Sequence, residues 1–198
     1  MSNEKRLDQE YWDTQYKTNA TGWDLGKVSP AIQEYAESYK NKDAKILIPG
    51  CGNSYEAEYL LSQGFNNITI LDIAPFLIEN LQKKFQNNLN IKIILGDFFK
   101  HLGQYDLIIE QTFFCALPPF VRKNYVLKMH QLLSVEGKLV GLLFNKTFKD
   151  GPPFGGSHIE YKKLFQHHFD FLQMNLCLNS IKPRANSELF IEFLKKTN

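Results

Sequence analysis

Short apolar runs alternate with longer amphipathic stretches along the chain from Lys45 onward. The runs are almost continuously apolar, which is typical of parallel strands that helices cover on both faces. They predict strands over 45–49, 68–72, 91–95, 105–110 and 138–144. The amphipathic stretches predict helices over 54–63, 75–86 and 119–133. This alternation predicts a Rossmann-like α/β fold with a mostly parallel sheet between two layers of helices.

The helix predicted over 75–86 has a distinct apolar side. Pro75 suits its first turn, because a proline there lacks only an N–H that would have no helical partner. Its apolar residues are expected to be buried together, and they are Phe76, Leu77, Leu81 and Phe85.

The C-terminal part of the chain departs from the alternation. A helix predicted over 157–168 is followed by extended runs at 169–178 and 188–195. The loop between these runs is rich in turn residues, which predicts an antiparallel hairpin. A hairpin that ends an otherwise parallel sheet is typical of class I methyltransferases of the seven-strand type and not of common dinucleotide-binding dehydrogenase domains.

The N-terminal part precedes the sheet. Helices are predicted over 4–16 and 30–40, with a loop over 18–28 between them. We interpret 1–42 as a helical lid segment over a ligand. Because domains cluster at roughly 100–200 residues, the length of 198 residues predicts a single domain over 1–198.

Composition and charge narrow the class of protein. Hydrophobic residues make up 43% and charged residues 22%, an ordinary globular balance. The 23 basic and 21 acidic residues are mixed along the chain, so nothing favours nucleic acid or a membrane as a partner. A small-molecule substrate is expected instead, and the oligomeric state is left open, a monomer included.

The cysteines and the N-terminus point to the cytoplasm. Cys51, Cys115 and Cys177 are widely spaced and form neither a disulfide framework nor a metal-ligand pattern, so no metal is expected. The polar N-terminus lacks the apolar stretch of a signal peptide, and no run reaches the roughly 18 apolar residues of a membrane span.

The loop after the first predicted strand is Gly50-Cys51-Gly52-Asn53-Ser54. Ligands of open α/β sheets bind beyond the carboxyl ends of the strands, where glycines let backbone N–H groups approach them closely. Two glycines alone fit an ordinary strand-to-helix turn equally well. The third glycine of the dinucleotide fingerprint is replaced by Tyr55, which argues against a pyrophosphate on the helix N-terminus.

Acidic residues follow the next two predicted strands. Asp72 lies where a carboxylate accepts hydrogen bonds from ribose hydroxyls. Asp97 can accept a hydrogen bond from an adenine amine, while Phe98 packs against the base. Each acid alone fits a helix cap. Together with the glycine loop at three successive strand ends, they favour a nucleoside, and S-adenosylmethionine over NAD.

Four sequence motifs are spread over almost the whole chain. They are Trp12-x3-Tyr16-x6-Trp23-Asp24-x-Gly26, Ile48-Pro49-Gly50-Cys51-Gly52, Glu110-Gln111-Thr112-Phe113-Phe114-Cys115-Ala116-Leu117-Pro118-Pro119 followed by Arg122, and Gly151-Pro152-Pro153-Phe154. In combination they resemble the thiopurine S-methyltransferase superfamily, and most closely its halide/thiol methyltransferase branch, the "harmless to ozone" proteins and their bacterial relatives.

The resemblance implies an S-adenosylmethionine-dependent methyltransferase. The cofactor contacts that it implies are Trp12, Tyr16, Trp23, Gly50, Gly52, Asp72, Ile73, Asp97, Phe98 and Gln111. Tyr16 stands where relatives usually have Trp, and Glu110-Gln111 stands where they have Asp-Tyr or Asp-Arg. That Arg is tied to substrate handling in thiopurine enzymes, so Gln111 argues against thiopurine-like substrates.

Methyl transfer from a sulfonium is a direct displacement that needs alignment and the removal of water from the nucleophile. The rings of Trp12, Tyr16 and Trp23 suit both needs, because aromatic faces stabilise cations and exclude water. The candidates for the substrate pocket are Trp23, Phe113, Phe114, Cys115, Pro152, Pro153, Phe154 and Arg184. Phe113 and Phe114 fit a hydrophobic core equally well.

No catalytic dyad is apparent, and an anionic nucleophile needs no strong base. Surface positions are expected for the histidines, which are His101, His130, His158, His167 and His168. Cys51 has no base beside it in sequence, so a nucleophilic role is not expected, whereas Cys115 is placed in the pocket.

The leading hypothesis is a methyltransferase for a small soft nucleophile, namely a thiol, hydrogen sulfide, thiocyanate or a halide. The alternatives are a larger thiol, heterocyclic or metalloid acceptor, and a non-catalytic adenosylmethionine sensor. An NAD-dependent oxidoreductase is disfavoured by the missing third glycine and the terminal hairpin.

Overall fold

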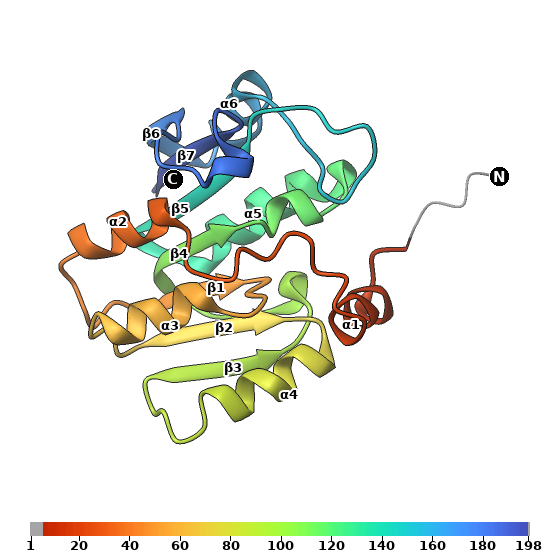
Figure 1. Ribbon diagram of the computed structural model, residues 1–198. Coiled ribbons are helices and arrows are strands. Elements are labelled where there is room, and N and C mark those ends of the chain that lie inside the picture. Colours follow the sequence, from red (N-terminus) through yellow and green to blue (C-terminus); the bar gives the residue numbers. More distant parts are fainter. Residues whose placement is uncertain (1–5, 198) are drawn as a thin grey trace.

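The protein is described by a computed structural model that covers residues 6–197. A seven-stranded sheet runs through the molecule in the order β3-β2-β1-β4-β5-β7-β6 (Figure 1). Its strands are β1 (Ile46–Pro49), β2 (Ile68–Asp72), β3 (Ile91–Leu95), β4 (Tyr105–Gln111), β5 (Leu133–Phe144), β6 (Phe169–Leu176) and β7 (Glu188–Lys195).

The pairing of the strands confirms the expected mixed sheet. β1 to β5 are parallel to one another, and β7 runs antiparallel to both β5 and β6. Every residue of β1 and β2 is buried, which agrees with their continuously apolar sequences. β5 begins at Leu133 rather than near Lys138, because its first residues follow directly from the preceding helix.

Helices cover both faces of the sheet (Figure 1). One hydrophobic cluster joins the sheet to α2 (Pro30–Ser38), α3 (Tyr55–Ser62) and α4 (Pro75–Lys84). A second cluster joins the opposite face to α5 (Arg122–Leu132) and α6 (His158–Phe165). Strand order reverses between β1 and β4, and open α/β sheets bind ligands at such a switch point.

Two expectations about the helices were wrong in detail. Phe76 is 36% exposed, because it lies about 100° around α4 from Leu77 and so outside the side that packs on the sheet. Ile78 is buried there instead, together with Leu81. The helix expected over 119–133 is split into a 3-10 turn over Pro119–Val121 and α5.

The N-terminal segment lies across the carboxyl ends of the strands. α1 (Gln9–Lys17) is shorter than the expected helix over 4–16, whose first two residues lie outside the described range. Asp13 accepts a hydrogen bond from the backbone N–H of Phe76 at 2.6 Å. Since the first N–H groups of a helix have no internal partners, this contact docks α1 on the start of α4. Within residues 6–197, no helix combines the length and apolarity that a membrane crossing needs.

Candidate active site

A cavity of about 640 Å³ lies at the carboxyl ends of β1 to β4, under the N-terminal segment. Every residue predicted to contact the cofactor lines it: Trp12, Tyr16, Trp23, Gly50, Gly52, Asp72, Ile73, Asp97, Phe98 and Gln111. These residues come from the lid and from the ends of four strands, β1 to β4, so the fold brings together residues that are far apart in the sequence.

The glycine loop has both conformational and steric reasons for its composition. Gly50 has a φ of +57°, a region that side chains with a Cβ rarely adopt. A Cβ on Gly50 would lie 2.2 Å from the ring of Phe113. The ring of Phe113 therefore packs directly on the backbone of the loop after β1.

Asp72 is a buried carboxylate at the end of β2. One of its oxygens accepts from the N–H of Ala74 at 3.0 Å and the other from the N–H of Gly52 at 3.3 Å. Burial raises the pKa of Asp72 to about 6, and the two backbone hydrogen bonds only partly oppose this effect. A carboxylate has about four lone-pair sites, so Asp72 can also accept from a diol in the cavity. The carboxylate thus suits a ribose.

Asp97 combines the two roles that the sequence left as alternatives. Its side chain caps the 3-10 turn Phe98–Lys100 by accepting from the N–H of Phe99 at 2.9 Å. It lines the cavity as well, beside the buried ring of Phe98. Asp72 likewise bonds to the turn that follows it, so capping does not exclude either acid from the cavity.

The aromatic residues of the lid contact one another above the glycine loop. The ring centroids of Trp12 and Trp23 are 5.6 Å apart, and those of Tyr16 and Trp23 are 5.9 Å apart, both edge to face. Asp24 accepts from the N–H of Gly26 at 2.7 Å and from the amide of Asn53. These contacts hold the loop after α1 against the loop after β1.

Most, but not all, of the residues expected for the substrate pocket line one part of the cavity, which is called the acceptor side below. Phe113, Cys115, Pro152, Pro153 and Arg184 line the cavity together with Trp23. Phe114 does not, because its ring is buried in the core, with its centroid 4.9 Å from that of Tyr125. Phe154 does not line it either, and its backbone N–H bonds to the carbonyl of Cys115 at 2.6 Å.

Glu110 fixes the turn that carries Phe113. Its carboxylate accepts from the N–H groups of Phe113 and Phe114, each at 2.8 Å, and from the hydroxyl of Tyr125 at 2.6 Å. Complete burial raises the pKa of Glu110 to about 7, against the effect of these hydrogen bonds. The next residue, Gln111, has a buried side-chain oxygen without a hydrogen-bond partner among the described residues.

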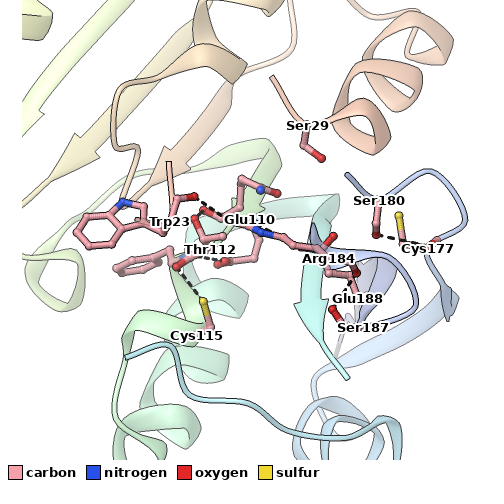
Figure 2. Close-up of polar contacts among 12 residues, drawn as sticks. Trp23, Ser29, Glu110, Thr112, Cys115, Cys177, Ser180, Arg184, Ser187 and Glu188 are labelled. Carbon is pink, nitrogen blue, oxygen red and sulfur yellow. Dashed lines mark hydrogen bonds and ion pairs between the residues drawn. The ribbon is translucent and has the colours of Figure 1, made fainter. Parts of the chain in front are cut away.

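Arg184 links the two ends of the chain at the cavity. Its guanidinium donates to the carbonyl of Trp23 at 2.7 Å and pairs with Glu188 at 3.3 Å (Figure 2). The sequence placed Arg184 near the substrate, and the structure shows that its charge already has a protein partner. Arg184 thereby ties the lid to the start of β7.

Neither the thiols beside the cavity nor the histidines offer a ready base. Burial raises the pKa of the Cys51 and Cys115 thiols, and Cys115 donates to the carbonyl of Thr112 at 3.2 Å (Figure 2). None of the five histidines lines the cavity. Three of them, His101, His130 and His168, are half-buried rather than on the surface, because their rings pack against aromatic neighbours.

Several lining residues escaped the sequence analysis. They are Asp24, Tyr55, Glu56, Thr112, Phe144, Lys146 and Phe148, among others. Asp24 belongs to the lid motif and Phe144 ends β5, so motif membership and the strand-end rule would have found these two.

Across residues 6–197, no group of three His, Cys, Asp or Glu side chains is placed to hold a metal ion.

The chain is similar to known proteins over most of its length. The family model of thiopurine S-methyltransferases matches residues 7–188. The chain belongs to this family. A probable thiol methyltransferase 2 of Arabidopsis thaliana is 35% identical over 77% of this chain and 70% of its own length. A thiopurine S-methyltransferase of Acinetobacter baylyi is 26% identical over 83% of this chain and 86% of its own.

A third relative and two solved structures extend the comparison. The thiocyanate methyltransferase 1 of Brassica oleracea is 26% identical over 74% of this chain and 67% of its own. A 1,6-didemethyltoxoflavin N1-methyltransferase of Burkholderia thailandensis, solved with S-adenosylhomocysteine, has a TM-score of 0.72 at 17% identity, covering 100% and 94% of the two chains. The magnesium protoporphyrin IX methyltransferase of Synechocystis, solved with bound S-adenosylmethionine, has a TM-score of 0.72 at 13% identity, covering 99% and 100%.

These similarities confirm the class I methyltransferase fold, the enzyme class and the cofactor. The protein is an S-adenosylmethionine-dependent methyltransferase of the thiopurine S-methyltransferase family. The buried carboxylate of Asp72 and the glycine loop beside it fit the ribose of that cofactor.

Proposed function

We propose that the enzyme transfers the methyl group to a small soft nucleophile, a thiol, hydrogen sulfide, thiocyanate or a halide, by direct in-line displacement. The observation that carries the proposal is the apolar character of the acceptor side. Its apolar side chains are Phe113, Leu117, Phe144, Phe148, Pro152 and Pro153, and Cys115, Lys146 and Arg184 lie beside them. Soft anions are less strongly hydrated than hard ones, so entering such surroundings costs them less, and stripping their water increases their reactivity.

The cofactor side is proposed to hold S-adenosylmethionine through residues of the sheet ends and the lid. Asp72 would accept from the ribose hydroxyls, and Phe98 would pack on the adenine with Asp97 beside it. The cofactor supplies a methyl group on a positively charged sulfur. The rings of Trp12, Tyr16 and Trp23 would face that charge, and each favourable contact of this kind contributes roughly 0.5–2 kcal/mol.

The chain's own contribution to the reaction is then alignment and the exclusion of water. Holding a nucleophile in line with the transferred carbon lowers the barrier by up to roughly 7–11 kcal/mol. Tyr16 of the lid lies beside Gly52, and the ring of Phe113 packs on Gly50, so aromatic rings flank the glycine loop. A nucleophile that is already anionic requires no proton acceptor, which agrees with the raised pKa of Cys115 and the remote histidines.

The test is a panel of acceptors incubated with the enzyme and S-adenosylmethionine, with S-adenosylhomocysteine formation as the readout. Hydrosulfide, thiocyanate, iodide and a small aromatic thiol are the soft members, and an alcohol of matched size is the control. Turnover with at least one soft member and none with the alcohol supports the proposal. Cofactor binding without turnover of any soft member would contradict it.

A larger heterocyclic thiol is the second candidate. It is favoured by the volume of the cavity and by relatives named thiopurine S-methyltransferase at 26–28% identity. A heterocyclic thiol in the same panel separates the candidates, because the leading proposal predicts a higher kcat/KM for hydrosulfide or a small thiol.

A further inference from the structure

A segment without helix or strand, residues 145–157, forms part of the acceptor side of the cavity. It contributes Lys146, Phe148, Pro152 and Pro153 to the lining. In Figure 1 it is the long teal loop that passes beside the start of α5. Loops of this length without regular structure need specific contacts to keep one conformation.

Arg122 supplies several of these contacts. Its side chain is only 5% exposed and donates through Nη2 to two successive carbonyls, that of Phe154 at 3.2 Å and that of Gly155 at 2.7 Å. Its Nη1 pairs with Glu160 at 2.6 Å, on the helix that follows the segment. The guanidinium also lies over the ring of Phe114, 4.7 Å from its centroid.

The held residues directly follow those that line the cavity. Pro152 and Pro153 face the cavity, and Phe154 is fixed from both sides, by Arg122 at its carbonyl and by the carbonyl of Cys115 at its N–H. A further hydrogen bond, from the N–H of Gly156 to the carbonyl of Lys146 at 3.0 Å, joins the two ends of the segment. Arg122 itself does not line the cavity.

We propose that Arg122 is a positioning residue for the methyl acceptor: it holds residues 152–155 against the 113–118 block and thereby sets the shape of the acceptor side. The inference rests on the proposed function for the meaning of the acceptor side. The proposal predicts that a substitution at Arg122 changes acceptor binding and not cofactor binding, because the contacts of Arg122 involve neither the glycine loop, nor Asp72, nor the lid.

The guanidinium of Arg122 suits these contacts better than the ammonium of a lysine would. A planar fork with several N–H groups can reach two carbonyls and a carboxylate at once, whereas the ammonium of a lysine acts as a single point charge. Glu160 is half exposed, so its carboxylate stays solvated if the arginine is replaced. Loss of the carbonyl contacts is therefore the main consequence of a substitution at Arg122.

The experiment compares Arg122→Gln, Arg122→Lys and Glu160→Gln, with Lys123→Gln as a control that removes an exposed neighbouring charge on the same helix. Amide hydrogen exchange of Phe154 and Gly156 reports on the segment without any acceptor. Calorimetry with S-adenosylhomocysteine gives the cofactor Kd, and steady-state kinetics gives the KM of the acceptor.

For Arg122→Gln we expect exchange of these amides to accelerate about tenfold and the acceptor KM to rise about tenfold, which corresponds to the loss of about one charge-assisted hydrogen bond. The cofactor Kd is expected to stay within about twofold, a change too small to indicate a lost contact. Arg122→Lys should recover part of both effects, and Glu160→Gln and Lys123→Gln should stay close to the unsubstituted enzyme.

Three results would overturn the proposal. The cofactor Kd could weaken as much as the acceptor KM, which would mean a general role in folding. Arg122→Lys could match the unsubstituted enzyme, which would remove the need for the fork. Glu160→Gln could equal Arg122→Gln, which would make the ion pair the essential contact. If no acceptor is turned over, the proposed function fails, while hydrogen exchange still decides whether Arg122 holds the segment.

Discussion

The cofactor side and the acceptor side of the cavity are held by contacts of different range along the chain. On the cofactor side, Asp72 bonds to Ala74 and Asp97 bonds to Phe99, each two residues away. On the acceptor side, Arg122 bonds to Gly155 and Arg184 bonds to Trp23, across 33 and 161 residues. The strand ends of the cofactor side are thus shaped mainly by their own turns, and Asp13 and Asp24 dock the lid on them. The acceptor side depends on single long side chains.

This difference has a functional consequence. A site made from strand ends keeps its geometry as long as the sheet is intact, and the cofactor is the constant partner of the reaction. A wall held by a few side chains can change with a few substitutions, which suits a family whose members are named for different acceptors. We therefore expect the two sides to respond to substitution in separable ways.

The largest effect is expected for Gly50→Ala, which changes a point where the two sides are in contact. Alanine would have to adopt a φ of +57° with its Cβ 2.2 Å from the ring of Phe113. Backbone strain and overpacking together should lower the free energy of unfolding by about 2–5 kcal/mol. Thermal or urea unfolding measures this change.

Gly22→Ala is the matched control, because nothing lies within 4 Å of a Cβ at that position and its φ is not positive. Its stability should change by less than about 0.5 kcal/mol. Equal destabilisation by both substitutions would refute the contact between the glycine loop and Phe113.

The next effect concerns the cofactor side alone. Asp72→Ala removes the acceptor proposed for the ribose hydroxyls, and each lost charge-assisted hydrogen bond should weaken cofactor binding by about 1.5–3 kcal/mol. Calorimetry with S-adenosylhomocysteine gives the Kd. An unchanged Kd would show that Asp72 does not bind the cofactor.

The same carboxylate predicts a pH dependence. Burial raises the pKa of Asp72 to about 6. The ionised form accepts the hydrogen bonds, so affinity should be full above that pH and fall as the pH drops below it, to about a tenth at pH 5. Titration of the Kd between pH 5 and 8 measures this, and Asp72→Asn should flatten the profile between those limits. A slope that persists in Asp72→Asn would assign the titration to another group.

The smallest effect separates two phenylalanines of the acceptor side. Phe113 lines the cavity and Phe154 does not, although both belong to motifs that suggested a substrate pocket. Phe113→Leu should raise the acceptor KM several-fold, because the substitution changes the apolar surface against the acceptor by about 1 kcal/mol. Phe154→Leu keeps its backbone contacts and should change the KM by less than about twofold. The reverse order would show that the acceptor lies elsewhere.

The difference between short-range and long-range contacts also explains which parts of the fold and the site could be predicted from the sequence. The ends of β2, β3 and β7 agree with the predicted strands, and the glycine loop, Asp72 and Asp97 line the cavity as expected. These features depend on local patterns, namely apolar runs and the turn residues that follow them. The order of strands then places their carboxyl ends together.

The acceptor side was less predictable because its geometry depends on contacts between distant residues. Phe114 turns into the core toward Tyr125, although its neighbour Phe113 faces the cavity. The hydrogen bond from Tyr125 to Glu110 joins α5 to β4, and no spacing in the sequence predicts it. Likewise, only the packed structure shows that the guanidinium of Arg184 already bonds to the carbonyl of Trp23 and pairs with Glu188.

The most direct test of the proposed chemistry is a comparison of benzenethiol with phenol, two acceptors of nearly the same shape that differ in sulfur and oxygen. The measurement is kcat/KM for each at saturating S-adenosylmethionine, with the methylated product identified by mass spectrometry. The apolar acceptor side without a base predicts turnover of benzenethiol and none, or almost none, of phenol. Equal or faster methylation of phenol would contradict the assignment of a soft nucleophile.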